Sequence, residues 1–345
     1  MKGMTRGIVI LAVVLVALVI IARVTSQNRL ATVEGGGFVE LLPGFDRADL
    51  ATVRAWVGTN PDSSVVLSRS GDGWVVASDY DWPARGENVK TLLDDLEGLS
   101  GELRSSDPAV LADYAIADSN SFHIAGEKSG GSELFHLVVG KNARGGGFVR
   151  QAGSNEVYLT SKGLRSSFGI WGDDPKPPQA QRWLDLQVVK LDRNDIDKIV
   201  LRNGKSTMVL EKEFEEPAAV SAAEGDSAAA PAGPDRTKWS WKPDKKGPFH
   251  KVKTDGVLNQ VASLYATKAA DPKKVDQYGL DPAERTVEIT LHDGTVTRLL
   301  FGTADQEGQD VYFRKDSGPP ALIHKTTVDR IFLDRKALLP SDEKT

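Results

Sequence analysis

The first apolar pattern in the chain is an unbroken run, GIVILAVVLVALVIIA, at residues 7–22, preceded by two basic residues. A helix that spans a bilayer needs about 17–25 residues, whereas the apolar part of a secretory signal has about 7–15. The run predicts a membrane anchor within residues 1–28, in a single-pass protein of the cytoplasmic (inner) membrane whose bulk is periplasmic. A cleaved signal peptide is the alternative, because Val24 and Ser26 suit the two small-residue positions of a cleavage site.

Beyond the anchor, apolar positions recur in two series that have the same order. Each series contains a helical stripe with i, i+3/i+4, i+7 spacing, formed by Leu92, Leu93, Leu96 and Leu99 in the first and by Val257, Leu258, Val261 and Leu264 in the second. Strand-like stretches match as well: LFHLVVG with VTRLLFG, and GFVRQ with VYFRK. So many matches in one order indicate a tandem duplication.

An Asp-Pro pair whose Pro lies six residues before a Tyr also occurs in each series: Asp107, Pro108 and Tyr114 in the first, Asp271, Pro272 and Tyr278 in the second. Asp is a preferred helix N-cap and Pro a preferred first residue, so each pair predicts a short helix that ends near the Tyr. Gly279 then suits a left-handed C′ position. Ala115 stands there in the first series, so that helix either ends differently or tolerates a strain of about 1 kcal/mol.

The fold class expected from these patterns is α+β, with two tandem copies of a small antiparallel sheet that carries one helix. We place the first repeat at residues 29–172 and the second at 187–340, joined by a Pro-rich linker at 173–186. The low-complexity stretch 215–236 predicts a disordered insertion in the second repeat. Asn203-Gly204 predicts the tip of a hairpin in that repeat.

Composition narrows the function classes. A chain that is 40% hydrophobic and 26% charged is globular outside the anchor. The net charge of −5, without a run of Lys and Arg, makes nucleic acid an unexpected partner. The chain has no Cys, which excludes disulfides, thiolate nucleophiles and Cys-ligated metals.

Two histidines form a candidate pair. His123 and His136 are predicted to face each other across a hairpin, and the matching positions in the second repeat are taken as Glu288 and Arg298. A His pair in one copy and an ion pair in the other indicates the solvent face of a sheet. None of the histidines has metal-ligand spacing, so we expect no metal, no cofactor and no catalytic residue.

A second candidate is the stretch SDYDWPARG, where Asp79 and Asp81 lie close to Trp74 and Trp82. Two carboxylates and two indole rings are the groups that a glycosidase or a glycan-binding site uses. An ordinary turn with buried aromatic residues is the simpler interpretation. Trp74 and Trp82 remain a candidate ligand platform that requires both rings to be exposed.

The order of Trp strand, amphipathic helix, YGLDP, LLFG and VYFRK resembles the domain-of-unknown-function family 4340. The second repeat carries the resemblance through Tyr278, Gly279, Leu280, Gly302 and Arg314. The first repeat retains Tyr114, Gly140 and Arg150. The resemblance implies structural roles for these residues, no catalytic ones, and a partner among envelope or inner-membrane proteins, such as ABC transporter subunits of the gliding-motility auxiliary kind.

The function expected from the sequence is therefore that of a membrane-anchored, non-enzymatic extracytoplasmic accessory or scaffold protein. The resemblance associates it with an ABC-type transport or motility system. An envelope glycan-binding module is the alternative.

Overall fold

The computed structural model describes residues 37–172, 175–215 and 235–339. The predicted anchor and most of the predicted insertion lie outside these residues. Within the described ranges, no helix is long and apolar enough to cross a membrane.

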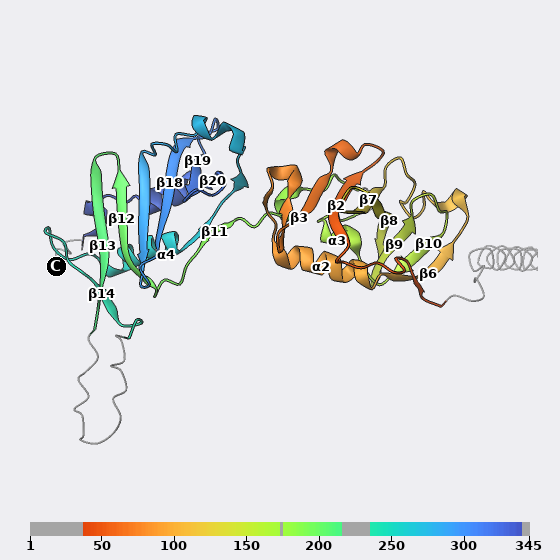
Figure 1. Ribbon diagram of the computed structural model, residues 1–345, viewed down its shortest axis with the longest axis horizontal. Coiled ribbons are helices and arrows are strands. Elements are labelled where there is room, and N and C mark those ends of the chain that lie inside the picture. Colours follow the sequence, from red (N-terminus) through yellow and green to blue (C-terminus); the bar gives the residue numbers. More distant parts are fainter. Residues whose placement is uncertain (1–36, 173–174, 216–234, 340–345) are drawn as a thin grey trace, which may run out of the picture. The chain divides into compact units, whose positions relative to one another are not determined.

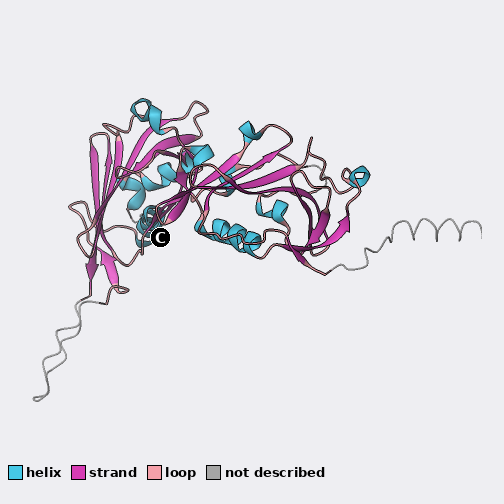
Figure 2. Cartoon of the chain, turned by 45° about the vertical axis from the view of Figure 1, so that its right-hand side comes forward, coloured by secondary structure: helices cyan, strands magenta, loops and turns pink. Residues whose placement is uncertain are grey.

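Antiparallel strands dominate the fold, and helices are few (Figures 1 and 2). The strands up to residue 172 are β1 (Val39–Glu40), β2 (Leu50–Val57), β3 (Val65–Ser70), β4 (Gly73–Val76), β5 (Trp82–Pro83), β6 (Ser100–Ser105), β7 (Phe122–Lys128), β8 (Glu133–Ala143), β9 (Gly146–Gln151) and β10 (Val157–Thr160). The α-helices of this region are α2 (Gly86–Glu97) and α3 (Leu164–Ser167).

The region after residue 178 repeats this series of elements. Its strands are β11 (Gln187–Lys190), β12 (Ile196–Asn203), β13 (Ser206–Phe214), β14 (Trp239–Trp241), β15 (Ser263–Tyr265), β16 (Lys268–Ala269), β17 (Arg285–Leu291), β18 (Val296–Ala304), β19 (Asp310–Lys315) and β20 (Ala321–His324). Its α-helices are α4 (Lys251–Ala262) and α5 (Lys325–Ile331).

The two copies share one strand order. In the first copy, neighbouring strands run β6-β10-β9-β8-β7-β2, and in the second they run β16-β20-β19-β18-β17-β12. The antiparallel pairs β3–β4 and β13–β14 also correspond. Six strands in the same spatial order confirm the tandem copies. Each sheet is larger than the small sheet expected, and each copy has a second α-helix.

The chain divides into two compact units. The first comprises the residues up to 51, with 55–63 and 91–178, and the second comprises 52–54, 64–90 and 179 onwards. The second unit therefore contains β3, β4 and β5. Within it, the predicted linker takes part in backbone pairing, because Ala84 forms a β-bridge with Leu184.

The predicted core positions are buried. All four leucines of the first helical stripe and all four apolar residues of the second are less than 9% exposed. In the second copy the hairpin of β17 and β18 has the expected register, with Glu288 opposite Arg298. β12 and β13 are joined by a two-residue turn, Gly204-Lys205, in which Gly204 has a φ of +53°. The predicted hairpin is therefore present, with its tip one residue later than Asn203-Gly204.

Candidate functional site

The Asp-Pro pairs begin short 3-10 helices, as their residue types require. The Asp107 carboxylate accepts a hydrogen bond from the backbone N–H of Ala109, and the Asp271 carboxylate accepts one from Lys273, each at 2.9 Å. The second helix, Pro272–Gln277, ends at Tyr278 as predicted. The first, Pro108–Val110, is shorter than predicted and does not reach Tyr114.

Each Tyr directs its backbone carbonyl at a strand of its own copy. The Tyr114 oxygen accepts from the N–H of Lys141 at 3.0 Å, and the Tyr278 oxygen accepts from Thr303 at 2.9 Å. The residue before each donor is a glycine, Gly140 or Gly302. A Cβ on either glycine would lie closer than 3.0 Å to the Tyr oxygen, so these positions admit only glycine without a backbone shift.

The residue after each Tyr is left-handed in both copies. Gly279 has a φ of +64° and Ala115 a φ of +54°. The first copy therefore keeps the backbone path of the second and accepts the strain that a Cβ causes there.

The aromatic ring of each motif Tyr packs on the outer side of the sheet. Tyr278 stacks on Tyr312 with ring centroids 3.8 Å apart, and its hydroxyl donates to the Asp271 carbonyl at 3.0 Å. Leu280 belongs to the same buried cluster. In the first copy Tyr114 packs against Phe148 at 4.6 Å. The motif residues therefore fasten the Asp-Pro segment to the strands beneath it.

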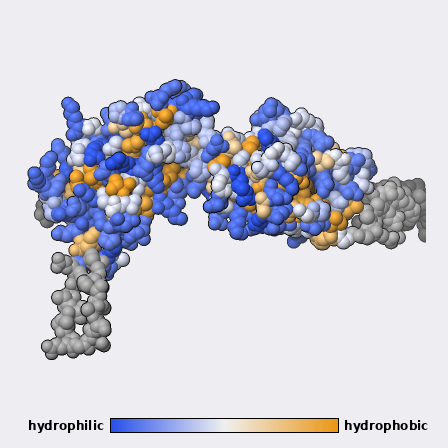
Figure 3. Space-filling model, in the orientation of Figure 1, coloured by the Kyte–Doolittle hydropathy of each residue, from blue (hydrophilic) through white to orange (hydrophobic). Residues whose placement is uncertain are grey.

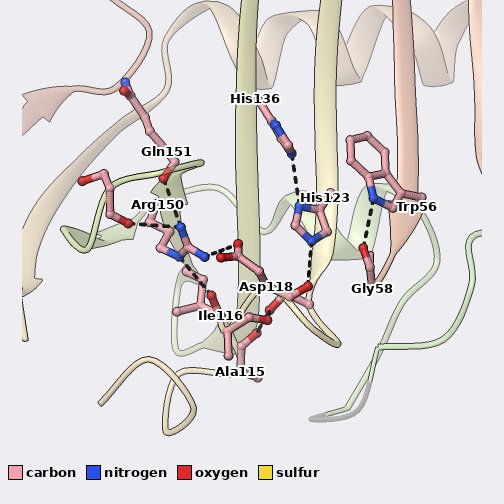
Figure 4. Close-up of polar contacts among 12 residues, drawn as sticks. Trp56, Gly58, Ala115, Ile116, Asp118, His123, His136, Arg150 and Gln151 are labelled. Atoms are coloured by element: carbon pink, nitrogen blue, oxygen red, sulfur yellow. Dashed lines mark hydrogen bonds and ion pairs between the residues drawn. The ribbon is translucent and has the colours of Figure 1, made fainter. Parts of the chain in front are cut away.

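Arg150 is the strongest polar anchor of this segment. Its side chain is 2% exposed, and its guanidinium donates to the carbonyls of Ile116 (2.9 Å), Gln151 (3.3 Å) and Ser154 (3.1 Å) and to the Asp118 carboxylate (Figure 4). Such a buried charge is stable only because its donors are satisfied.

Arg314, which takes the place of Arg150 in the second copy, is less enclosed. It lies opposite Leu300 in the β18–β19 register, as Arg150 lies opposite Val138 in β8–β9. Its residue is half-buried, and its buried Nε has no hydrogen-bond partner within the described chain. The arginine at this position is therefore buried and hydrogen-bonded more completely in the first copy than in the second.

The two predicted histidines meet beside this anchor. His123 on β7 and His136 on β8 lie with Nδ1 of the former 3.1 Å from Nε2 of the latter, which confirms that their side chains meet across the hairpin, in a diagonal pairing (Figure 4). Trp56 on β2 stacks on His123 with its ring almost parallel, 6° apart, at 5.1 Å. With Arg150 on β9, four neighbouring strands contribute to one cluster.

The hydrogen bonds of the pair have a defined direction. The Nε2 atom of His123 lies 3.4 Å from the Asp118 carbonyl, which can only accept, so this nitrogen carries the proton. Nδ1 of the neutral His123 ring then accepts, and Nε2 of His136 donates to it. The first added proton therefore belongs on Nδ1 of His136, which lies 3.8 Å from Glu133.

Burial is the main electrostatic influence on the pair. Desolvation lowers the pKa of His123 from its usual value, and it also lowers the pKa of His136 against the opposing effect of Glu133. Protonation of both rings would place two N–H groups against each other, so the cluster holds one added proton more readily than two. His136 lines a cavity of about 290 Å³, and its side chain is 24% exposed.

The prediction that this pair lies on the solvent face is wrong for His123, which is only 5% exposed. The assigned counterpart of His123 is also wrong. Counting from the equivalent glycines, Arg298 does match His136, but Glu288 matches Ala125, which lies opposite His136. The counterpart of His123 is Thr286. The assignment was displaced by two residues because it took the two histidines as directly opposite each other, whereas the register places His123 opposite Val138.

The candidate ligand platform does not have the exposed pair of rings that it requires. Trp82 is 3% exposed, and its indole N–H donates to the Asp185 carbonyl at 2.9 Å. Trp74 is half-buried, with the Arg69 guanidinium 5.2 Å from its ring centroid. Burial raises the pKa of the nearby Asp79 carboxyl, while Asp81 is exposed. The simpler interpretation, a turn with buried aromatic residues, fits Trp82.

The sequence did not predict two features that have the character of a functional site. Trp56 and Asp118 join the His pair from separate segments, and no local pattern marks them.

The second feature is Lys212, which is 5% exposed and donates to the Arg193 carbonyl; burial lowers its pKa to about 8. Its ammonium lies 4.3 Å from the Trp239 ring centroid. Alternation along β13 was the available signal, because Lys212 shares a face with Leu210.

The cluster is suited to clamping and to binding a proton, and it has no arrangement for metal chemistry. Among the described residues, no group of three or more His, Asp or Glu side chains is placed to hold a metal ion.

Comparison with known proteins gives a family and no closer relative. No curated protein and no solved structure matches the chain. The family model described as "Domain of unknown function (DUF4340)" matches residues 74–235 and 239–336. The first match begins at Trp74 in β4 and the second at Trp239 in β14. The chain thus belongs to the DUF4340 family and carries it as two copies.

Proposed function

We propose that this protein is a membrane-anchored, non-enzymatic scaffold of the cell envelope, whose two copies bind partner proteins of an ABC-type transport or motility system. The apolar run at residues 7–22 supports the anchor and the extracytoplasmic location. The family resemblance supports the partner class.

The observation that carries the proposal is that the polar side chains of the motif bind atoms of their own copy. Arg150 binds three backbone carbonyls of its own copy, and the carboxylates of Asp107 and Asp271 cap their own helices. A catalytic acid or base must instead present an atom to a substrate. Motif groups used in this way form a structural frame, by which we mean the Asp caps, the Tyr–Gly backbone contacts and the motif arginines. Because this frame is present twice, the chain offers two similar binding faces.

The surface supports binding of proteins. On the visible side of the second copy, apolar residues lie among polar and charged ones (Figure 3). Interfaces between separately folded proteins have this mixed character. The glycan-binding alternative loses support, because one of its two rings is buried.

The test is photo-crosslinking in living cells from exposed positions of the full chain. Trp171, Tyr265 and Val252 are 66%, 58% and 73% exposed, so a photoreactive residue at each reaches a bound partner. The buried Phe301 is the matched control. We expect transporter permease or auxiliary subunits to be crosslinked from at least one exposed position and from none at Phe301. Recovery of glycan fragments alone, or of nothing, contradicts the proposal.

A further inference from the structure

The outer edge of β13 is open over most of its length. β13 has nine residues, and β14 pairs only with the last three, at 212–214. Figure 1 shows β14 beside one end of β13 only. Among the residues that the structure describes, no strand pairs with the outer edge at residues 206–210.

The backbone groups on this edge can be identified. The carbonyl of Glu211 accepts from the N–H of Lys242, so Glu211 points its backbone at the outer edge. Since this direction alternates along a strand, Thr207 and Val209 present their N–H and C=O groups to the same edge. No group in the described part of the chain is hydrogen-bonded to these four backbone groups. Residues 206–210, STMVL, lack the charges and prolines that protect edge strands.

The first copy closes the equivalent edge. β4 pairs with four of the six residues of β3. Beyond β4, the N–H of Val66 is bound by the hydroxyl of Ser78 at 3.1 Å. An edge covered in one copy and open in the other indicates a binding difference between the copies.

A groove runs beside the open edge. It is a cavity of about 520 Å³ that residues 206–209 of β13 line together with residues of β12 and of the segment after α5. Its apolar lining consists of Leu201, Met208, Phe332 and Leu333. Residues 244–246 form another part of its wall. A strand added to β13 would lie beside this cavity, with alternate side chains directed at the apolar lining.

The part of the cavity wall formed by residues 244–246 is held in place before anything binds. The Arg335 guanidinium makes two bonds to the Asp244 carboxylate, at 2.7 and 2.6 Å, and a third to the Gly247 carbonyl. It also lies 4.4 Å from the Phe249 ring centroid. Arg335 lowers the pKa of Asp244 to about 2, so this contact persists in mild acid. A preformed wall reduces the ordering cost of binding.

The charge of the groove favours an acidic occupant. Lys245 and Lys246 are exposed and make no ion pair within the described ranges, whereas Asp244 is already neutralised by Arg335. Asp334 is the remaining acidic residue of the lining.

We propose that this groove binds an extended, acidic segment of another protein by β-strand addition. The partner's backbone bonds to Thr207 and Val209, its alternate apolar side chains enter the cavity, and its acidic side chains meet Lys245 and Lys246. The inference deepens the proposed function, on which it rests, by naming the place and the mode of partner binding.

The experiment is selection of a random dodecapeptide library on the full chain in lipid nanodiscs. The best enriched peptide is then synthesised, and its affinity is measured by fluorescence anisotropy. We expect enriched peptides to combine acidic residues with alternating apolar ones. Val209→Pro removes an edge N–H without breaking a β12–β13 bond and weakens binding by about tenfold or more. The matched control Val209→Thr keeps the N–H and leaves the affinity within about twofold.

A second variant keeps the test decisive if Val209→Pro disturbs the fold, which circular dichroism would reveal. Lys245→Glu with Lys246→Glu changes only exposed side chains and is expected to weaken the acidic peptide by about tenfold. The proposal is overturned if no peptide is enriched, or if the peptide binds both variants as tightly as the unchanged chain. It is also overturned if light scattering finds a dimer that Val209→Pro dissociates, since the occupant is then a second copy.

This inference and the proposed function fail separately. Crosslinked transporter subunits with no peptide binding would place the partner on another surface. Peptide binding without crosslinked subunits would support the groove and contradict the partner class.

Discussion

The outer faces of the two copies differ most at three equivalent positions on neighbouring strands. The first copy has Trp56, Ala125 and His136, and the second has Arg202, Glu288 and Arg298. In the second copy Glu288 lies 3.8 Å from Arg202 and 3.6 Å from Arg298, so the positions form an ionic network. In the first copy the same positions are part of a partly buried aromatic and histidine cluster.

Beneath this difference the backbone contacts are the same. The Tyr carbonyl, the glycine opposite it and the left-handed residue that follows recur in both copies. Close backbone approach leaves no room for variation, because any side chain there collides with a peptide group. A side chain on the face of a strand can be exchanged as long as its own polar groups are satisfied. The frame is therefore common to both copies, and the outer faces are free to specialise.

The largest effect is expected where the frame is tightest. Gly302→Ala places a Cβ against the Tyr278 carbonyl and is expected to destabilise the second copy by about 3 kcal/mol. Gly140→Ala is expected to do the same to the first copy. Amide hydrogen exchange of β18 and β8 reports the free energy of opening for each copy separately.

Gly256→Ala is the control for these two changes. Gly256 lies inside α4, and a Cβ there meets nothing within 4 Å. This change is expected to stabilise the second copy by up to about 1 kcal/mol, since alanine is the better helix former. Equal stability of all three variants would show that the Tyr–Gly contact is not the common frame.

The next effect separates the two arginines. Arg150→Met removes a guanidinium that binds three carbonyls and one carboxylate, and the carbonyls are left without it, so we expect a loss of about 2–3 kcal/mol. Arg314→Met is expected to cost less than about 1 kcal/mol, because the residue is half-buried and its Nε is already unpaired. Exchange protection of β9 and β19 gives both values. Similar losses for the two changes would contradict the difference in anchoring.

Local patterns predicted much of the frame and little of the cluster. The helical stripes, the Asp caps and the Asn-Gly hairpin depend on neighbouring residues, and the structure has each of them. The burial of His123 depends on Trp56, which is distant in sequence, and no short pattern records that contact. The size of each sheet was underestimated for the same reason, because short edge strands such as β1 and β16 exist only through their partners.

The correspondence between residues of the two copies could be predicted around the motif Tyr but not along β7 and β17. The two copies match residue for residue around Tyr114 and Tyr278, where the backbone is constrained. On β7 the pairing of His123 with Glu288 was displaced by two residues, because Ala125 and not His123 lies directly opposite His136. Strand register, which fixes the true counterpart, is set by hydrogen bonds across the sheet and is not visible in one strand alone.

A smaller effect concerns the left-handed residue. A Cβ at a φ of +54° costs about 1–2 kcal/mol of strain, and Ala115→Gly removes that strain. The same change increases the conformational entropy of the unfolded chain, which opposes the gain. The net expectation is a stabilisation of the first copy by about 0.5–1 kcal/mol. Gly279→Ala makes the opposite exchange in the second copy and is expected to destabilise it, with the new Cβ 3.0 Å from Thr303. Melting temperatures of the two variants should move in opposite directions, and a shift in the same direction would contradict a shared backbone path.

The smallest effect is a pH dependence confined to the first copy. Burial lowers the pKa of His123 and His136 below the unfolded value of about 6.5, so the unfolded chain binds more protons than the folded one in mild acid. The stability that the neutral pair contributes is therefore complete above pH 6.5 and is lost as the pH falls below it. In the second copy the equivalents are Thr286 and Arg298, so no histidine occupies either position.

The measurement is hydrogen-exchange protection of β7 and β17 in the same chain at pH 7.5 and pH 5.5, corrected for the intrinsic exchange rate. We expect β7 to lose protection relative to β17. His123→Gln with His136→Gln removes both titrating rings and should abolish the difference, whereas His324→Gln, an exposed position in the second copy, should leave it unchanged. If the double variant keeps the acid sensitivity of β7, the titrating group is not the pair. The contrast between the two outer faces would then lie in packing alone.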